Sequence, residues 1–276
     1  MSPAIQDLQI LHLEADDEGP SYYRVLVSGK DVKYISIDPH IYNMEDLVFP
    51  TTLIPQLPVF PPDDLPSIRN VWHSVKVDHR CLTLAEYNGD GENTSFNTNT
   101  HAATVDQTTS ASLSLPRNVV AKFANFTWEV EYYAQETTIY QRLEATAAVA
   151  SQPRKIAPQF LGHITEENGK RVIGFLLEKI EGGRFPDGAV VKDLERCRDL
   201  VGRLHGLGIL HGDLNRFNFL LVNDVNEGRD VLLDFESARI GAEQWEMEEE
   251  MGGLEAKLMD EEGLGGVEEW VGELKY

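Results

Sequence analysis

The stretch His211-Gly212-Asp213-Leu214-Asn215-Arg216-Phe217-Asn218 is a polar segment that lies between two apolar runs of the chain. Ile209-Leu210 comes directly before it, and Phe219-Leu220-Leu221-Val222 comes directly after it. A polar loop between buried segments is where a rigid scaffold usually displays functional side chains. The stretch is therefore the first candidate for a functional site, and its flanks are candidates for the core.

A second apolar run, Val231-Leu232-Leu233, ends at Asp234-Phe235-Glu236. The segment 223–228 between the two runs is rich in turn-forming residues, which predicts a β-hairpin. The hairpin would place Asn218 before one strand and Asp234 at the end of the other. An amide oxygen and a carboxylate are hard ligands that suit Mg²⁺, and the carboxylate of Asp213 can accept a hydroxyl proton. These residue types at this spacing indicate phosphoryl transfer.

The pattern His-x-Asp-x4-Asn followed by Asp-Phe-x resembles the catalytic and metal loops of the protein-kinase-like superfamily. The His-Gly-Asp and Asp-Phe-Glu forms look more like the aminoglycoside phosphotransferase and choline kinase branch, and like a group of fungal kinase-like proteins, than like ordinary protein kinases. The resemblance covers about residues 119–240. It implies that Asp213 is the catalytic base, and that Asn218 and Asp234 hold the metal. The short Asp-x-Glu spacing predicts that Glu236 joins them, directly or through a water.

The fold that this resemblance implies is α+β, a two-lobed protein-kinase-like fold with a β-rich N-lobe and a reduced helical C-lobe. ATP and Mg²⁺ would be bound in the cleft between the lobes. The expected divisions are an N-terminal extension with extra strands and a Pro-rich arm (1–70), the N-lobe to the hinge (71–180), and a short C-lobe with the catalytic loop and an acidic tail (181–276).

One lysine, Lys122, lies in the short apolar strand that we expect at 119–123. In the helix expected at 129–145, Glu136 falls on an otherwise apolar face. The apolar members of that face are Tyr133, Tyr140 and Leu143. A carboxylate on such a face is costly unless it is paired, and Lys122 is the available partner. The pair resembles the strand lysine and helix glutamate of kinases, in which the lysine meets the α- and β-phosphates. Glu131, on a more polar face, is the alternative partner.

A buried strand is expected at 172–177, followed by the Gly-containing segment 178–183. By the same resemblance this is the hinge between the lobes. The adenine would meet main-chain groups of Glu178 and Ile180, with Leu177 at the back of the pocket. No G-x-G-x-x-G phosphate loop precedes Lys122. Thr108-Thr109-Ser110-Ala111-Ser112 stands in its place, where small side chains would let backbone N–H groups approach a phosphate, although less freely than glycine.

Outside these motifs, residues 1–20 are expected to be an irregular acidic lead, and 22–37 to form two strands around the turn Ser28-Gly29-Lys30-Asp31. A helix is expected at 191–207, with Val191, Leu194, Val201 and Leu204 at helical spacing. The last part of the chain, 243–276, is acidic with interspersed apolar residues, which indicates one or two short amphipathic helices.

The formal net charge is −22, and Lys and Arg are not clustered, which argues against a nucleic acid or an anionic membrane as a partner. Two cysteines provide no disulfide framework, so we expect a reducing, cytoplasmic compartment. Neither a signal peptide nor a run of about 18 apolar residues is evident.

Three functions remain open at this stage. The first is an ATP- and Mg²⁺-dependent phosphotransferase that acts on a hydroxyl group of a small molecule. The second is a kinase that phosphorylates Ser or Thr of proteins. The third is a pseudokinase, a binding or scaffold module that has kept the fold. The absent glycine-rich loop favours the third, whereas the set Lys122, Asp213, Asn218 and Asp234 favours an enzyme.

Overall fold

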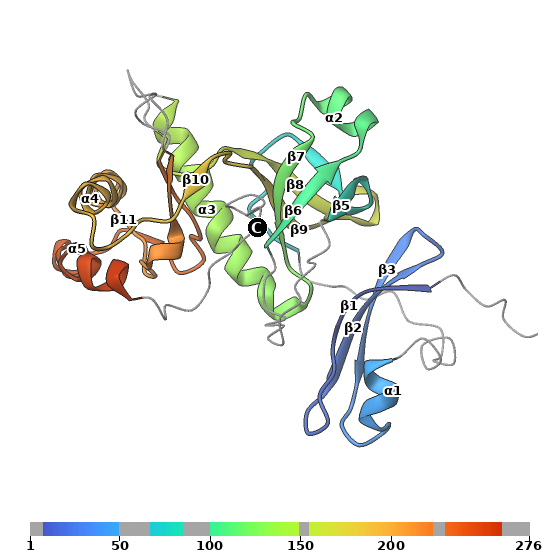
Figure 1. Cartoon of the computed structure of the whole chain (residues 1–276). Helices are drawn as coiled ribbons and strands as arrows, with labels where there is room; N and C mark the ends of the chain where they lie inside the picture. The colour runs from blue at the N-terminus through green and yellow to red at the C-terminus, as the bar shows by residue number, and fades with distance from the viewer. Residues whose placement is uncertain (1–7, 50–66, 85–99, 149–154, 223–229, 261–276) are drawn as a thin grey trace, which may run out of the picture.

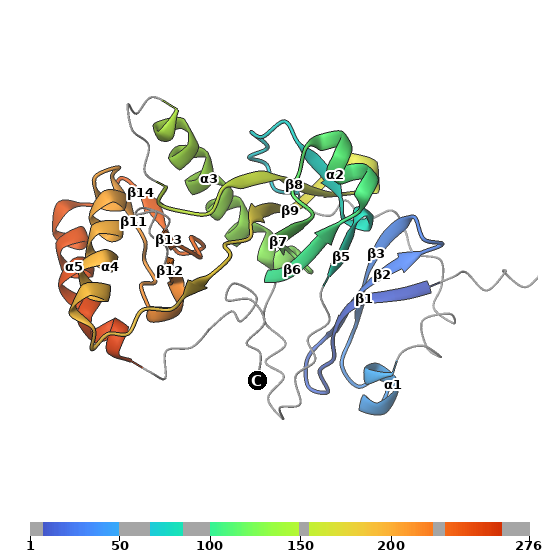
Figure 2. The ribbon, with the colours of Figure 1, turned by 45° about the horizontal axis from the view of Figure 1, so that its top comes forward.

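The structure is a computed structural model of the whole chain, and it describes residues 8–49, 67–84, 100–148, 155–222 and 230–260. The architecture is mixed α+β. A six-stranded sheet lies between a small N-terminal sheet and a helical part that contains α4 and α5 (Figures 1 and 2). In the described part of the chain, no helix has the length and apolar character needed to cross a membrane.

The N-terminal sheet is antiparallel, in the order β1-β2-β3. Its elements are β1 (Leu8–Glu14), β2 (Ser21–Val27) and β3 (Asp31–Ile37), with the short helix α1 (Met44–Val48) after them. The two strands expected around the turn at Ser28 are therefore confirmed as β2 and β3. The expectation of an irregular lead is wrong for β1, which pairs with β2 along its whole length.

The central sheet has the order β4-β8-β9-β7-β6-β5, and all neighbours are antiparallel except β4 and β8. Its strands are β4 (Lys76–Asp78), β5 (Leu82–Leu84), β6 (Thr100–Val105), β7 (Asn118–Phe123), β8 (Phe160–Glu166) and β9 (Arg171–Glu178). Lys122 on β7 is paired with Thr100 on one side and Phe175 on the other. The lysine is therefore in an inner strand of the sheet, close to the first residue of β6.

The hydroxyl-rich stretch Thr108–Ser112 does not occupy the place of a phosphate loop. It lies in helix α2 (Gln107–Leu113), which joins β6 to β7. The register places Asn118 opposite Thr104 and Lys122 opposite Thr100, so α2 is at the end of β7 away from Lys122. The expectation was wrong because Thr100, the first residue of β6, is opposite Lys122, whereas α2 follows the other end of β6. Residues 85–99, which precede β6, are outside the described residues.

Helix α3 (Val130–Ala147) packs on the face of the central sheet that carries Lys122, and it shares one apolar core with β9, α4, β12 and β13. The remaining elements are β10 (Gly183–Arg184), α4 (Val191–His205), β11 (Ile209–Leu210), β12 (Phe219–Val222), β13 (Val231–Leu232), β14 (Arg239–Ile240) and α5 (Gln244–Met259). The expected hairpin is present, because β12 and β13 pair antiparallel with Phe219 opposite Leu232.

Helix α4 buries Leu194, Val201 and Leu204 at the spacing read from the sequence, whereas Val191 is 70% exposed and is not part of that face. The expectation failed there because Val191 is the first residue of the helix. Helix α5 lies beside α4 (Figure 2). The expected amphipathic helix near the C-terminal end is thus α5, and residues 261–276 are outside the described part.

Candidate active site

Lys122 is the centre of a cluster of three carboxylates that come from two distant segments of the chain. Its Nζ lies 2.7 Å from Glu136 Oε2, 3.1 Å from Asp234 Oδ1 and 3.1 Å from Glu236 Oε1. Strand β7 supplies the lysine, α3 supplies Glu136, and the segment after β13 supplies the other two acids. The sequence motifs at 122, 136 and 234–236 therefore meet at one site.

The helix partner of Lys122 is Glu136 and not Glu131. The Glu136 side chain is completely buried, whereas Glu131 is exposed on the opposite side of α3. Glu136 also accepts a hydrogen bond from the backbone N–H of Phe235 through Oε1, at 3.3 Å. Asp234 has a positive φ of 59°, a conformation that non-glycine residues seldom adopt and that is enriched at functional sites. The turn at Asp234 directs its carboxylate towards the lysine.

The charges of the cluster do not balance, because three carboxylates surround one ammonium group. Burial raises the pKa of Glu136 to about 7, in spite of the opposing effect of Lys122. Burial alone would lower the pKa of Lys122, but Asp234, Glu136 and Glu236 raise it well above its usual value. Lys122 therefore stays charged at neutral pH, and the acidic excess favours binding of a further cation.

Asp213 lies on an exposed loop whose shape is set by hydrogen bonds within the loop. The Nδ2 atom of Asn218 donates to the backbone carbonyl of Asp213 at 2.8 Å, and it is 3.4 Å from the Asp213 carboxylate. His211 is completely buried, and its Nε2 donates to the carbonyl of Leu233 at 2.9 Å. The hydrogen bond between His211 and Leu233 joins the loop that carries Asp213 to the segment that carries Asp234.

The hydrogen bonds of His211 define its protonation state. The Nδ1 atom is 3.4 Å from the N–H of Asp213, which can only donate, so the neutral imidazole carries its proton on Nε2. Burial lowers the pKa of His211, which agrees with a neutral ring. His211 thus braces the loop against the segment that carries Asp234.

Glu250 of α5 holds the backbone of the same loop, and sequence reasoning missed it. Its carboxylate accepts from the N–H of Gly212 at 2.7 Å and from the N–H of His211 at 3.2 Å, and His205 Nε2 lies 2.7 Å away. The sequence pattern that could have identified it is the one seen for Glu136, a carboxylate on the apolar face of a helix. Glu250 is three residues after Met247 and four before Leu254, both of which are buried. The pattern was not recognised because several neighbouring residues of α5 are also acidic.

The glycine in His-Gly-Asp is required by the close approach of two segments. Gly212 has a φ of +84°, and a Cβ atom at this position would lie 2.5 Å from the backbone oxygen of Ser237. A larger residue would push the loop away from the segment that follows Asp234. The structure thus gives a local reason for glycine at this position of the His-Gly-Asp stretch.

Aromatic side chains connect the loop, α3 and the sheet in one column. The rings of His211 and Phe235 are 5.2 Å apart, those of Phe235 and Tyr140 are 5.6 Å apart, and those of Tyr140 and Phe160 are 5.7 Å apart. Aromatic contacts of this kind contribute about 0.5–1.5 kcal/mol each beyond area burial. The column fixes α3, and with it Glu136, relative to the loop at Asp213.

The residues expected to contact adenine lie where the central sheet meets the helical part. Leu177 and Ile180 are buried, and Glu178 is the last residue of β9. The N–H of Glu178 is already hydrogen-bonded, because it donates to the carbonyl of Gln159 at 2.9 Å.

A cavity of about 590 Å³ lies between α3, the segment 155–160 and the end of α4, and Lys122 does not line it.

The expected metal set was Asn218, Asp234 and Glu236. Asp234 and Glu236 lie together and share their neighbourhood with Glu136, with ligand oxygens within 4.8 Å of one another. The described side-chain hydrogen bonds of Asn218 go to Asp213 through Nδ2. The two half-buried carboxylates provide the hard oxygen donors that Mg²⁺ needs, so the residues fit such an ion.

Comparison with known proteins gives a partial likeness. No protein-family model matches the chain. A probable bifunctional tRNA threonylcarbamoyladenosine biosynthesis protein of Methanoculleus marisnigri is 32% identical over 110 residues, which are 40% of this chain and 18% of that protein. A protein of the same name from Methanospirillum hungatei is 30% identical over 99 residues, 35% of this chain and 17% of that protein. The chain therefore matches less than a fifth of the length of each relative.

Proposed function

We propose that the chain is an ATP- and Mg²⁺-dependent phosphotransferase with a two-lobed, protein-kinase-like fold, and that it transfers the γ-phosphate to a hydroxyl group. The observation that carries this proposal is the contact of Lys122 with Glu136, Asp234 and Glu236, next to the loop that carries Asp213. The central sheet with α3 is the N-lobe in this proposal, the part from β10 to α5 is the C-lobe, and residues 178–183 are the hinge.

Each residue has a role that follows from its position. Lys122, held by Glu136, is placed to neutralise the α- and β-phosphates. Asp213 is exposed and outside the carboxylate cluster, so it can orient an acceptor hydroxyl and take its proton. Main-chain groups at Glu178 and Ile180 would contact the adenine, with Leu177 behind it.

Asp234 and Glu236 would hold Mg²⁺, and Asn218 would join them if its amide oxygen turns towards the ion. When bound, the ion neutralises charge on the phosphate oxygens. Both carboxylates contact Lys122, so each of them would interact with the lysine and with the metal. The exposed fractions of 38% for Asp234 and 32% for Glu236 support access from the solvent side of the cleft.

We propose a small, neutral or cationic molecule as the acceptor. The net charge of −22 would oppose the approach of an anionic acceptor more than that of Mg·ATP, whose charge the metal and Lys122 offset locally. The acceptor could also be a protein hydroxyl, and a panel of peptides and small alcohols incubated with ATP radiolabelled at the γ-phosphate would separate the two classes.

Thermal unfolding with ATP and Mg²⁺, compared with ATP and EDTA, tests the nucleotide site. A ligand at about 100 times its Kd stabilises the native state by about 2.7 kcal/mol, which is a measurable shift. For the enzyme hypothesis, Asp213→Asn should reduce turnover about 10²–10⁴-fold while leaving Mg·ATP affinity nearly unchanged. A wild-type protein that binds Mg·ATP and phosphorylates no acceptor in the panel would favour the pseudokinase.

The names of the two relatives favour a second candidate, a role in the biosynthesis of threonylcarbamoyladenosine in tRNA. The strongly acidic composition opposes direct contact with tRNA phosphates. In this candidate the chain would act on a protein of the modification machinery. A gel-shift titration with tRNA, expected to show no complex, checks the electrostatic part of the argument.

A further inference from the structure

A second cavity lies on the face of the central sheet opposite to Lys122, between that sheet and the N-terminal sheet. Its volume is about 320 Å³, at the lower end of the range for small-molecule sites. Side chains alternate along a strand, so Phe123 and His101 face away from the Lys122 side. The lining residues that carry the argument are His12, Arg24, His79, His101 and Phe123.

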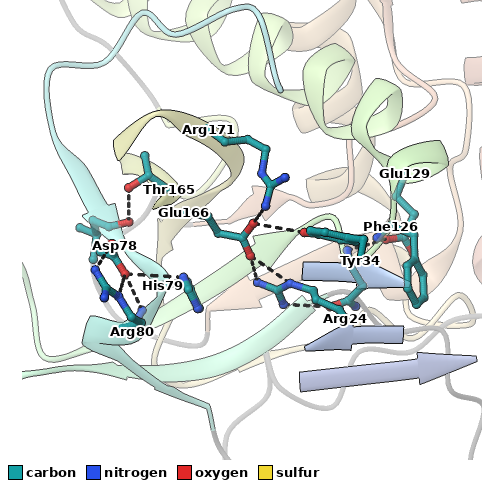
Figure 3. A network of polar contacts seen from close by, with 12 residues as sticks. Arg24, Tyr34, Asp78, His79, Arg80, Phe126, Glu129, Thr165, Glu166 and Arg171 are labelled. Carbon is teal, nitrogen blue, oxygen red and sulfur yellow. Dashed lines mark hydrogen bonds and ion pairs between the residues drawn. The ribbon is translucent and has the colours of Figure 1, made fainter. Parts of the chain in front are cut away.

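Arg24, which lines this cavity, belongs to a buried ion cluster in which positive charges outnumber negative ones (Figure 3). Arg24 and Arg171 both bind the carboxylate of Glu166, and all three side chains are almost completely buried. Tyr34 adds a neutral hydroxyl donor to Glu166 at 3.2 Å. Two guanidinium groups thus share one carboxylate. A buried charge without a full partner is costly, so the cluster favours an additional anion.

The nearby carboxylates Asp78 and Glu129 have other contacts, although Asp78 Oδ1 also lies 3.5 Å from Nδ1 of His79, which leaves Nε2 of that ring for a ligand. Asp78 binds the guanidinium of Arg80, with Oδ1 at 2.7 Å from Nε. Glu129 accepts hydrogen bonds from the backbone N–H groups of Asn125 and Phe126, at 2.6 and 2.9 Å. Arg24 also lies 5.2 Å from the ring centre of Phe123, a cation–π contact that offsets only part of its charge.

Three imidazoles around the cavity supply hydrogen-bonding groups. Burial lowers the pKa of His12, His79 and His101, and the charge of Arg24 lowers each of them further, although Glu166 and Asp78 oppose this for His79. The pKa of His101 falls to about 4, so this ring is neutral at pH 7. A neutral imidazole offers one N–H donor and one acceptor. The positive field of Arg24 therefore reaches all three rings, and each can donate to an oxygen atom.

We propose that this cavity is a binding site for a small oxyanion, a phosphate- or carboxylate-bearing metabolite, separate from the nucleotide cleft. The anion accepts from the guanidinium of Arg24 and from the imidazole N–H groups, with one flank against Phe123. The negative charge of the anion balances the excess positive charge of Arg24 and Arg171 over Glu166. Because His12 and Arg24 belong to the N-terminal sheet and His101 to the central sheet, a bound anion connects the two sheets.

The test uses the full chain, with inorganic phosphate and malonate as probes at pH 7.5. Histidine side-chain NMR signals report the place of binding. We expect saturable shifts for His12, His79 and His101, with those of His205 and His211 unchanged. The stronger of the two probes distinguishes a phosphate from a carboxylate ligand. Signals of the three cavity histidines that stay unchanged with both probes would overturn the proposal.

Variants separate this site from unspecific anion binding. His101→Phe keeps the ring contact with Phe123 and leaves the ion cluster intact, so it should fold and bind the anion at least tenfold more weakly by calorimetry. Arg24→Gln should abolish binding, but it also changes the ion cluster, so His101→Phe is the deciding variant. Arg198→Gln removes a surface cation that pairs with Glu255 and serves as the control, with unchanged affinity. Equal affinity in wild type and His101→Phe would refute the site.

Discussion

Replacing Glu250 by glutamine should destabilise the loop that carries Asp213. The carboxylate accepts from the N–H groups of both His211 and Gly212, and its side chain is only 6% exposed. An amide of the same shape has one acceptor oxygen and one NH₂ donor, so one of the two backbone N–H groups loses its partner. Losing a backbone hydrogen bond to a charged group at this partly exposed position costs about 1–3 kcal/mol. We expect Glu250→Gln to lower the free energy of unfolding by this amount.

Urea unfolding at pH 7 measures the global effect, and native-state hydrogen exchange measures the local one. Since 1.4 kcal/mol corresponds to a factor of ten, the amides of His211 and Gly212 should exchange about 5- to 150-fold faster in the variant. Glu249→Gln is the matched control, because it removes the same charge from an exposed position of the same helix. Its effect should stay within about 0.5 kcal/mol. If the two variants are equally stable, Glu250 does not hold the loop.

Three further predictions concern the loop, the metal and the N-terminal sheet. Gly212→Ala should lower the free energy of unfolding in urea more than Gly208→Ala does, because both positions have positive φ but only the first would bring a Cβ atom into contact with another segment. Asp234→Asn should weaken Mg·ATP binding in calorimetry, whereas Asp213→Asn should leave it nearly unchanged. Although burial alone would raise the pKa of Glu166, the two guanidinium groups hold it below its usual value of 4.5. Its contribution to stability is therefore complete above that pH and is lost as the pH falls through the lowered pKa, and Glu166→Gln should flatten this acid dependence of unfolding.

The parts of the fold that the sequence predicted correctly are those in which a local pattern decides the outcome. Glu136 interrupts an apolar helical face, and a buried carboxylate requires a cation, so the sequence alone indicates Lys122 as its partner. The hairpin of β12 and β13 followed in the same way from two apolar runs around a turn. In both cases the residues that carry the signal also make the contact.

The parts that were missed depend on partners far away in the sequence. Strand β1 has mostly half-buried residues and forms because β2 offers a strand edge, which its own sequence does not show. Thr108–Ser112 was misplaced because strand order and register decide which connection lies beside Lys122. Glu250 was missed because it is one of five acids in the segment 243–250, and only the packing of α5 selects one of them.

The arrangement around Lys122 is consistent with the proposal that the same acids stabilise the fold and bind a metal. When all three carboxylates are ionised around the one ammonium group, the formal charge of the cluster is −2, and Glu136 is the member without access to solvent. A divalent cation that binds Asp234 and Glu236 would make the cluster neutral and would leave Lys122 to its contact with Glu136. The lysine could then face the phosphates of a nucleotide without losing its buried partner. Lys122 contacts all three acids, which under this proposal would keep the site close to the geometry that its ligands need.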